Sequence, residues 1–196
     1  MARQLWLLRH ADAEPHGTRP DFQRRLTERG ERQARLAGLA LARMGAQVGP
    51  VLTSPKERAL RTATLALQAW NEQPGETGCH GELVVHHPLQ HGFGARQALA
   101  AMADMGADGR LLMVGHEPDF SEVITELTGA RVDLKKAGLA VVRLLPGLES
   151  DGGASPEGGL HGALDAPVSS DAAGELVLLL RPAELALIAS VALAEV

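Results

Sequence analysis

The sequence predicts an α/β protein, a three-layer α/β/α sandwich in which helices cover both faces of a mostly parallel central sheet. Short apolar runs alternate with segments that carry Leu, Ala and Ile at helical spacing. Several of the runs are apolar enough to be buried on both faces, which is typical of parallel strands. The length of 196 residues suits one domain, so we expect residues 1–196 to form a single unit without a cap domain.

The predicted elements follow one another along the chain. Six apolar runs predict strands at 4–8, 50–53, 83–87, 111–114, 139–145 and 175–180. Four segments with helical spacing predict helices at 30–44, 56–70, 95–105 and 119–128. A closing helix is expected after Arg181, because Pro182 suits the first turn of a helix. Gly, Ser, Ala, Pro and Asp dominate 146–174, which predicts a flexible loop between the last two strands.

The first predicted strand ends in Arg9 and His10. In open α/β sheets, ligands bind beyond the carboxyl ends of the strands. Arginine offers a planar fork of donors for phosphate oxygens. Neutral histidine offers a nucleophilic nitrogen, because its reference pKa is about 6.5. An isolated pair of this kind is more often a surface feature, so the assignment depends on two further segments.

Both further segments also follow strands. The sequence T-S-P-K-E-R-A-L-R-T-A at 53–63 opens a helix that Ser54 can cap, with Arg58 about one turn in. The sequence V-G-H-E-P-D at 114–119 places His116 beside a helix N-terminus, whose free amides suit an anion. We therefore expect Arg9, His10, Arg58 and His116 to meet at one edge of the sheet and to surround a phosphoryl group.

Charge and composition narrow the partners. The formal net charge is −5, which gives no support for a nucleic-acid or membrane partner acting through net charge. Cys79 is the one cysteine, which fits a reducing compartment. Neither terminus has the pattern of a secretory signal or a membrane span. We expect a cytoplasmic protein without nucleic-acid or membrane partners.

Other phosphate and metal chemistries find no matching pattern. A cysteine phosphatase needs Cys-x5-Arg, but position 85 is Val. No G-x-x-x-x-G-K-[ST] motif occurs, so an ATP-binding loop is not expected. Four histidines lie close together in sequence, but at spacings that match neither a zinc finger nor H-E-x-x-H: His80, His86, His87 and His91. We expect neither a metal nor a cofactor.

Taken together, these motifs resemble the histidine phosphatase superfamily. A strand ending in R-H, then T-S-P-x-x-R-A-x-x-T-A, then V-G-H-E-P-D follow the order of that superfamily, and R-R-L-T-E-R-G at 24–30 is similar to a segment of its small SixA-like phosphohistidine phosphatases. K-K-A-G-L-A at 135–140 is similar to their basic turn before the fifth strand. The resemblance covers nearly all of 3–145, resumes at 175–190, and implies a phosphoglycerate mutase-like fold.

The resemblance also implies roles. His10 would be the nucleophile, Arg9, Arg58 and His116 would form the phosphate pocket, and Arg24 would reach its rim. The sequence departs from the pattern at Ala11, where many members have Gly, and at Arg25, which replaces the Pro of the R-P-L-T segment.

A general acid has no clear counterpart. Larger members of the superfamily carry a glutamate after the third strand, where this chain has Gln90, His91 and Gly92. Four residues remain candidates for the proton donor: His91, Glu82, Glu14 and Asp12.

The resulting prediction is a metal-independent phosphatase for phosphohistidine on a protein, such as a phosphohistidine-bearing domain in signal transduction. A departing imidazole is far less basic than an alkoxide, so it needs less help from an acid. The connection between residues 85 and 111 is too short for a helical lid, which would leave the pocket open to a protein substrate. The alternatives are a broad phosphatase for small phosphate esters and a phosphoprotein-binding module with little turnover. Retention of His10 argues against the binding module.

Overall fold

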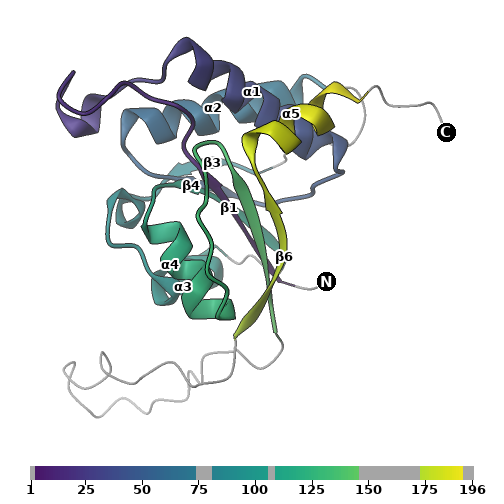
Figure 1. The fold of residues 1–196 in the computed structure, drawn as a ribbon. Coiled ribbons are helices and arrows are strands. Elements are labelled where there is room, and N and C mark those ends of the chain that lie inside the picture. Colours follow the sequence, from purple (N-terminus) through teal and green to yellow (C-terminus); the bar gives the residue numbers. More distant parts are fainter. Residues whose placement is uncertain (1–2, 74–80, 106–108, 146–172, 192–196) are drawn as a thin grey trace.

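A central sheet of six strands forms the middle of the molecule (Figure 1). The computed structural model describes residues 3–73, 81–105, 109–145 and 173–191. The strands are β1 (Gln4–Arg9), β2 (Val51–Thr53), β3 (Leu83–Val85), β4 (Arg110–Gly115), β5 (Leu139–Leu144) and β6 (Gly174–Leu180). The α-helices are α1 (Glu28–Arg43), α2 (Glu57–Asn71), α3 (Ala95–Asp104), α4 (Asp119–Thr128) and α5 (Pro182–Ser190). Two 3-10 helices, η1 (Asp21–Gln23) and η2 (His87–Gln90), were not expected from the sequence.

The predicted α/β class is confirmed, and each predicted element lies within a few residues of an observed one. No cap domain is present in the described part of the chain. Residues 146–172 of the predicted loop at 146–174 lie outside the described residues. Gly174, which was expected to end that loop, is the first residue of β6. None of the helices in the described ranges is long and apolar enough to cross a membrane.

The strand order is β3-β2-β4-β1-β5-β6. β3, β2, β4 and β1 run parallel to one another, whereas β5 is antiparallel to both β1 and β6. The sheet is therefore mostly parallel, as predicted. The carboxyl ends of β2, β4 and β1 lie at the same edge, next to one another.

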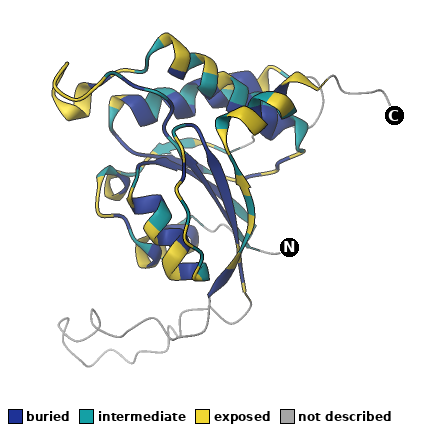
Figure 2. Cartoon of the chain, viewed as in Figure 1, coloured by how far each residue is buried: buried dark blue, intermediate teal, exposed yellow. Residues whose placement is uncertain are grey.

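Helices cover both faces of the sheet. The side chains of β1 point alternately to one face and to the other. Leu5 and Leu7 belong to the apolar cluster under α3 and α4. Trp6 and Leu8 belong to the cluster under α1, α2 and α5. Figure 2 shows the sheet buried between these two helical layers. Burial on both faces explains why the central strands read as continuous apolar runs.

The helices α1 and α2 pack closely where they cross. A Cβ atom placed on Gly38 of α1 would lie 2.0 Å from the backbone oxygen of Ala66 in α2. Only a residue without a side chain fits this approach, and α2 is thereby held against α1.

Residues 14–25 form an extension between β1 and α1 that we call the arm. Its two ends are joined by an antiparallel bridge between Ala13 and Leu26, and Glu14 N–H donates to the Arg25 oxygen at 2.9 Å. The arm projects at the upper left of Figure 1 and is largely exposed in Figure 2. It carries η1 to the edge of the sheet where β1 ends.

Candidate active site

The carboxyl ends of β1 and β4 bring two histidines together. Arg9, the last residue of β1, lies opposite Gly115, the last residue of β4. His10 N–H donates to the Gly115 oxygen at 2.9 Å. The rings of His10 and His116 lie with their centroids 5.1 Å apart.

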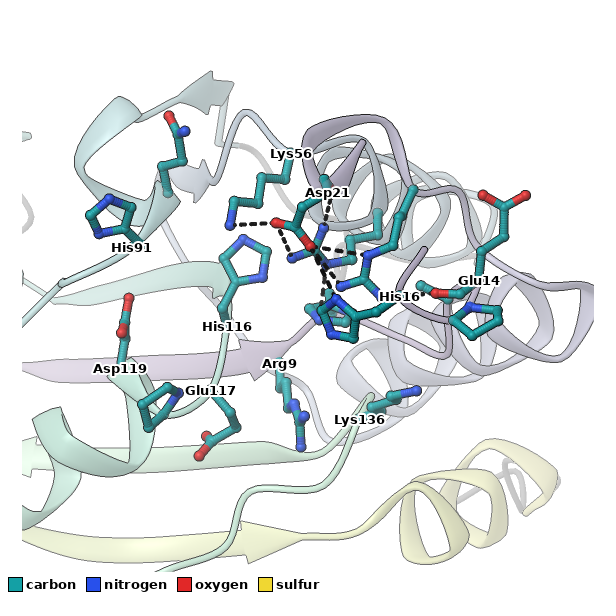
Figure 3. Close-up of a pocket in the computed structure, with 17 residues that line it drawn as sticks. Arg9, Glu14, His16, Asp21, Lys56, His91, His116, Glu117, Asp119 and Lys136 are labelled. Atoms are coloured by element: carbon teal, nitrogen blue, oxygen red, sulfur yellow. Dashed lines mark hydrogen bonds and ion pairs between the residues drawn. The ribbon is translucent and has the colours of Figure 1, made fainter. Parts of the chain in front are cut away.

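A pocket of about 550 Å³ lies at this edge of the sheet. Five residues predicted from the sequence line it together: Arg9, His10, Arg24, Arg58 and His116. They come from β1 and the residue after it, the arm, the first turn of α2 and the residue after β4, and Figure 3 labels Arg9 and His116 among the side chains of this pocket. Their roles in chemistry stay predictions, but the expected gathering of cations and histidines is present.

His10 is buried and holds one tautomer. Its Nδ1 lies 2.8 Å from the backbone oxygen of Ala11. Because a carbonyl oxygen only accepts, Nδ1 carries the hydrogen and Nε2 keeps a lone pair. That lone pair accepts a hydrogen bond from Nε of Arg58 at 3.2 Å. The nucleophilic nitrogen of this side chain is therefore Nε2.

Both histidines are uncharged at neutral pH. Burial, together with the positive charges of Arg58 and Arg9, lowers the pKa of His10 to about 3, although the bond to Ala11 opposes this shift. Burial, His10 and Arg58 lower the pKa of His116 to about 2. A neutral imidazole at His10 is the form that can attack phosphorus.

Two buried nitrogens of the pocket have no hydrogen-bond partner among the described residues: Nε of Arg9 and Nδ1 of His116. One other nitrogen of each side chain is engaged. Nη1 of Arg9 donates to the Leu134 oxygen at 2.7 Å, and Nε2 of His116 lies 2.8 Å from Oγ of Ser54. An unsatisfied buried polar group costs free energy, so an anion that paired with these nitrogens would bind favourably.

Thr62 ties the first turn of α2 to the residue after His10. Its hydroxyl donates to the backbone oxygen of Arg58 at 2.6 Å and accepts from Ala11 N–H at 3.0 Å. Thr62 is fully buried and fixes Arg58 relative to His10. The sequence analysis did not single it out, although it is the second threonine of the 53–63 motif.

Asp21 of the arm is a pocket residue that the sequence analysis missed. Its carboxylate lies 2.9 Å from Nη2 of Arg24, 2.9 Å from Nζ of Lys56 and 3.4 Å from Nη2 of Arg58. Partial burial opposes ionisation, but Lys56, Arg58 and Arg24 hold the pKa of Asp21 well below its usual range. No periodic pattern marks residues in the arm, so the sequence carried no signal for this position.

Of the four candidates for a general acid, Glu82 is wrong. It directly precedes β3 and therefore lies at the amino end of a parallel strand, at the opposite edge of the sheet from the pocket. Asp12 does not line the pocket. Its carboxylate accepts from Nζ of Lys136 at 2.8 Å and from the Thr27 hydroxyl at 2.9 Å. These bonds outweigh partial burial and lower the pKa of Asp12.

The remaining two candidates do line the pocket. The Glu14 carboxylate accepts from the backbone N–H of Arg25 and from the guanidinium of Arg19, which together lower its pKa. His91 lies at the exposed mouth, directly after η2.

Glu117 is a further carboxyl of the pocket that the sequence analysis did not consider. Burial raises its pKa, although a hydrogen bond from Ser121 and the charge of Arg9 oppose the rise. Its Oε1 is buried without a hydrogen-bond partner among the described residues. Figure 3 shows this carboxylate next to Arg9. The candidates proposed from the sequence are His91, Glu82, Glu14 and Asp12, whereas Glu117 lies inside the V-G-H-E-P-D motif.

No group of three or more His, Cys, Asp or Glu side chains in the described ranges is arranged to hold a metal ion. Of the four clustered histidines, His80 lies outside those ranges. The pocket is dominated instead by arginine, lysine and histidine, which suit a phosphoryl group.

The fold and this pocket are those expected of a histidine phosphatase. The sequence model of the histidine phosphatase superfamily (branch 1) matches residues 5–79, which include Arg9, His10 and Arg58. An uncharacterised protein from Picosynechococcus sp. is 31% identical over 150 residues, which cover 71% of this chain and 84% of that protein.

Solved structures of SixA proteins are similar to this chain in fold. A protein from Nakamurella multipartitia assigned as the phosphohistidine phosphatase SixA is 25% identical, with a TM-score of 0.63 over 93% of this chain and 97% of that one. The protein histidine phosphatase SixA in complex with tungstate is 19% identical, with a TM-score of 0.62 over 93% of this chain and 99% of that one. The chain belongs to the histidine phosphatase superfamily, is SixA-like in structure, and is a phosphatase.

Proposed function

We propose that this phosphatase hydrolyses phosphohistidine carried on a protein, without a metal ion and through a phosphoryl group on His10. The observation that carries the proposal is the state of His10. Its Nδ1 is bound to the Ala11 oxygen, and Nε2 has a lone pair in a pocket lined by Arg9, Arg58 and His116.

The chemistry follows from that arrangement. Nε2 of His10 attacks phosphorus, a new N–P bond forms, and the P–N bond to the substrate imidazole breaks. The departing imidazole nitrogen takes up a proton. Water then attacks the phosphoryl group and releases phosphate and free His10. Arg58, whose Nε donates to Nε2 of His10, turns to the phosphoryl oxygens, and Arg9 and His116 add donors.

Two features support phosphohistidine as the substrate. Glu14 and Asp12, the carboxyls proposed as acids from the sequence, have lowered pKa values and are poor proton donors at neutral pH. An imidazole with a pKa of about 6.5 leaves without a strong acid, whereas an alkoxide does not. The similarity to SixA structures points the same way.

The absence of a cap domain in the described part of the chain supports a protein substrate. Between β3 and β4 that part contains only η2 and α3, and α3 packs on the face of the sheet. The pocket can therefore receive a side chain displayed on another protein.

We predict a higher kcat/KM for phosphohistidine than for phosphoserine when both are placed in the same peptide. The ratio should be at least about tenfold, or roughly 1.4 kcal/mol of barrier. Placing both residues in one peptide keeps binding of the surrounding chain constant. The phenolate of p-nitrophenyl phosphate leaves without help. Its kcat/KM should therefore lie closer to that of phosphohistidine than the kcat/KM of phosphoserine does. Equal rates for phosphoserine and phosphohistidine would contradict the proposal.

A broad small-ester phosphatase is the second candidate, and Glu117 is the observation that favours it. Its raised pKa means that this carboxyl keeps its proton to a higher pH than an ordinary glutamate. Figure 3 shows it beside Arg9, at the margin of the site. If phosphoserine is hydrolysed as fast as phosphohistidine, Glu117 becomes the first residue to test as the acid.

A further inference from the structure

The cations at the mouth of the pocket are already paired with carboxylates. Oδ1 of Asp21 accepts from Nε of Arg24 at 3.0 Å and lies 2.9 Å from its Nη2. Oδ2 of Asp21 lies 2.9 Å from Nζ of Lys56. Figure 3 shows the Asp21 carboxylate joined to Lys56 by a dashed line. On the other side of the pocket, Lys136 pairs with Asp12 at 2.8 Å.

The unpaired nitrogens of the pocket belong to other side chains. Arg58 is engaged as well. Its Nε donates to His10, its Nη1 donates to the backbone oxygen of Asp21 at 2.7 Å, and its Nη2 lies 3.4 Å from Oδ2 of Asp21. Nε of Arg9 and Nδ1 of His116 are the buried pocket nitrogens without a partner among the described residues. The pocket therefore offers free hydrogen-bonding capacity next to the nucleophile, while its outer cations are neutralised.

Asp21 is held in place by more than its carboxylate. The arm is closed by the bridge between Ala13 and Leu26. Nη1 of Arg24 donates to the Glu14 oxygen at 2.8 Å, and the Arg24 side chain is buried. Because Arg58 also binds the backbone oxygen of Asp21, the arm places this carboxylate at a fixed position over the outer cations.

We propose that Asp21 is a specificity-determining residue that occupies Arg24 and Lys56, so that the pocket accepts one phosphoryl group and disfavours a second anionic group beside it. This inference rests on the proposed binding of the phosphoryl group beside His10. It narrows the substrate class to phosphoryl groups whose neighbouring atoms are uncharged, such as a phosphorylated imidazole side chain. Phosphate esters of small hydroxy acids, which carry a carboxylate next to the phosphate, are disfavoured.

The physical reason is competition between anions. A substrate carboxylate that approached Arg24 or Lys56 would have to displace Asp21 from both, or lie next to it and be repelled. Neutralising Asp21 while keeping its shape removes both penalties. Asp21→Asn should therefore leave the two cations free to bind a second anionic group.

Direct binding of two ligands tests this without any need for turnover. Methyl phosphate and phosphoglycolate differ by one carboxylate, and calorimetry on the full chain at pH 7.5 gives the Kd of each. The wild-type protein should bind phosphoglycolate no more tightly than methyl phosphate. Asp21→Asn should bind phosphoglycolate at least tenfold more tightly than methyl phosphate. Because only binding is measured, a failed phosphohistidine preference leaves this test unaffected.

Matched variants separate the proposal from a general charge effect. Asp104→Asn makes the same chemical change on the exposed end of α3, away from the pocket, and should keep the wild-type ratio. Lys56→Met in the wild-type background should change both affinities by the same factor, because Asp21 already occupies Lys56; this variant tests the idea even if Asp21→Asn fails to fold. Combined with Asp21→Asn, Lys56→Met should remove most of the gain.

Three outcomes would overturn the proposal. The first is a wild-type protein that already prefers phosphoglycolate tenfold. The second is an unchanged ratio in folded Asp21→Asn, or the same gain in Asp104→Asn. The third is a selective loss of phosphoglycolate binding in Lys56→Met alone.

Discussion

His10 and His116 are buried in the neutral form, and this has a consequence for stability. With folded pKa values of about 3 and about 2, neither ring takes up a proton until the solution is strongly acidic. In the unfolded chain both rings protonate near pH 6.5. As the pH falls below that value, protons therefore bind the unfolded state, and the free energy of unfolding decreases.

We predict that the free energy of unfolding falls by about 2 kcal/mol for each of the two histidines when the pH is lowered from 7.5 to 5. The slope is about 1.4 kcal/mol per pH unit below the pKa of the unfolded chain. His10→Gln removes one of the two rings, so its free energy of unfolding should fall less between these pH values than that of the wild type, by the contribution of one histidine. Urea denaturation at the two pH values measures this. His91→Gln, the same change at an exposed position, should keep the full wild-type loss. A wild-type stability that stays constant over this range would contradict the burial of two neutral rings.

The strand ends predicted Arg9, His10 and His116 from the sequence, and the family resemblance added Arg24, but neither predicted Asp21 or Glu117. Arg9, His10 and His116 follow directly from the ends of β1 and β4, where an apolar run stops and a polar residue begins. Asp21 lies in the arm, whose path depends on contacts with Arg24 and Lys56 that no periodicity reveals. The direction of the Glu117 side chain depends in the same way on the turn between β4 and α4.

At the level of elements, apolar runs and helical spacing located the six strands and the helices α1 to α4 that the structure describes, and Pro182 indicated α5. They did not locate η1 or η2, because a single short turn has no period to read. The third strand was expected to reach residue 87 but ends at Val85, since η2 begins at His87 with Pro88 in its first turn. Periodicity also could not show that β5 runs antiparallel to its neighbours, because the direction of a strand depends on how it pairs in the sheet and not on its own residue pattern.

The close crossing of α1 and α2 makes Gly38 a sensitive position. The added methyl group of Gly38→Ala would meet the Ala66 oxygen at 2.0 Å, so the two helices would have to move apart. Alanine favours a helix over glycine by about 1 kcal/mol, but overpacking costs about 1–3 kcal/mol and occasionally more. We predict that Gly38→Ala lowers the free energy of unfolding by about 2 kcal/mol or more, measured by urea denaturation.

Gly109→Ala is the matched control. Among the described residues, Gly109 has nothing within 4 Å of an added Cβ atom, so Gly109→Ala should stay within about 0.5 kcal/mol of the wild type. A Gly38→Ala protein as stable as Gly109→Ala would show that α1 and α2 do not approach as closely as the structure has them. Because α2 carries Arg58, a loss of this packing should also lower activity.

For the whole molecule, the mostly parallel sheet explains why the site could be located from the sequence. Neighbouring parallel strands end at one edge, so polar residues after β1, β2 and β4 must gather there. We propose that residues 1–196 form one domain around this sheet. The arm and its carboxylate, which shape the mouth of the pocket, could not be predicted, because they depend on one irregular connection between β1 and α1.

Trapping the phosphorylated enzyme tests the central claim, that His10 carries the phosphoryl group. The protein is mixed with a phosphohistidine peptide in the presence of a chelator, and the reaction is stopped within milliseconds in alkali, where phosphohistidine is stable. Peptide mapping by mass spectrometry should find the phosphoryl group on His10 of the wild type, and His10→Gln should neither trap it nor release phosphate. A phosphoryl group on another residue, or continued turnover by His10→Gln, would contradict the account.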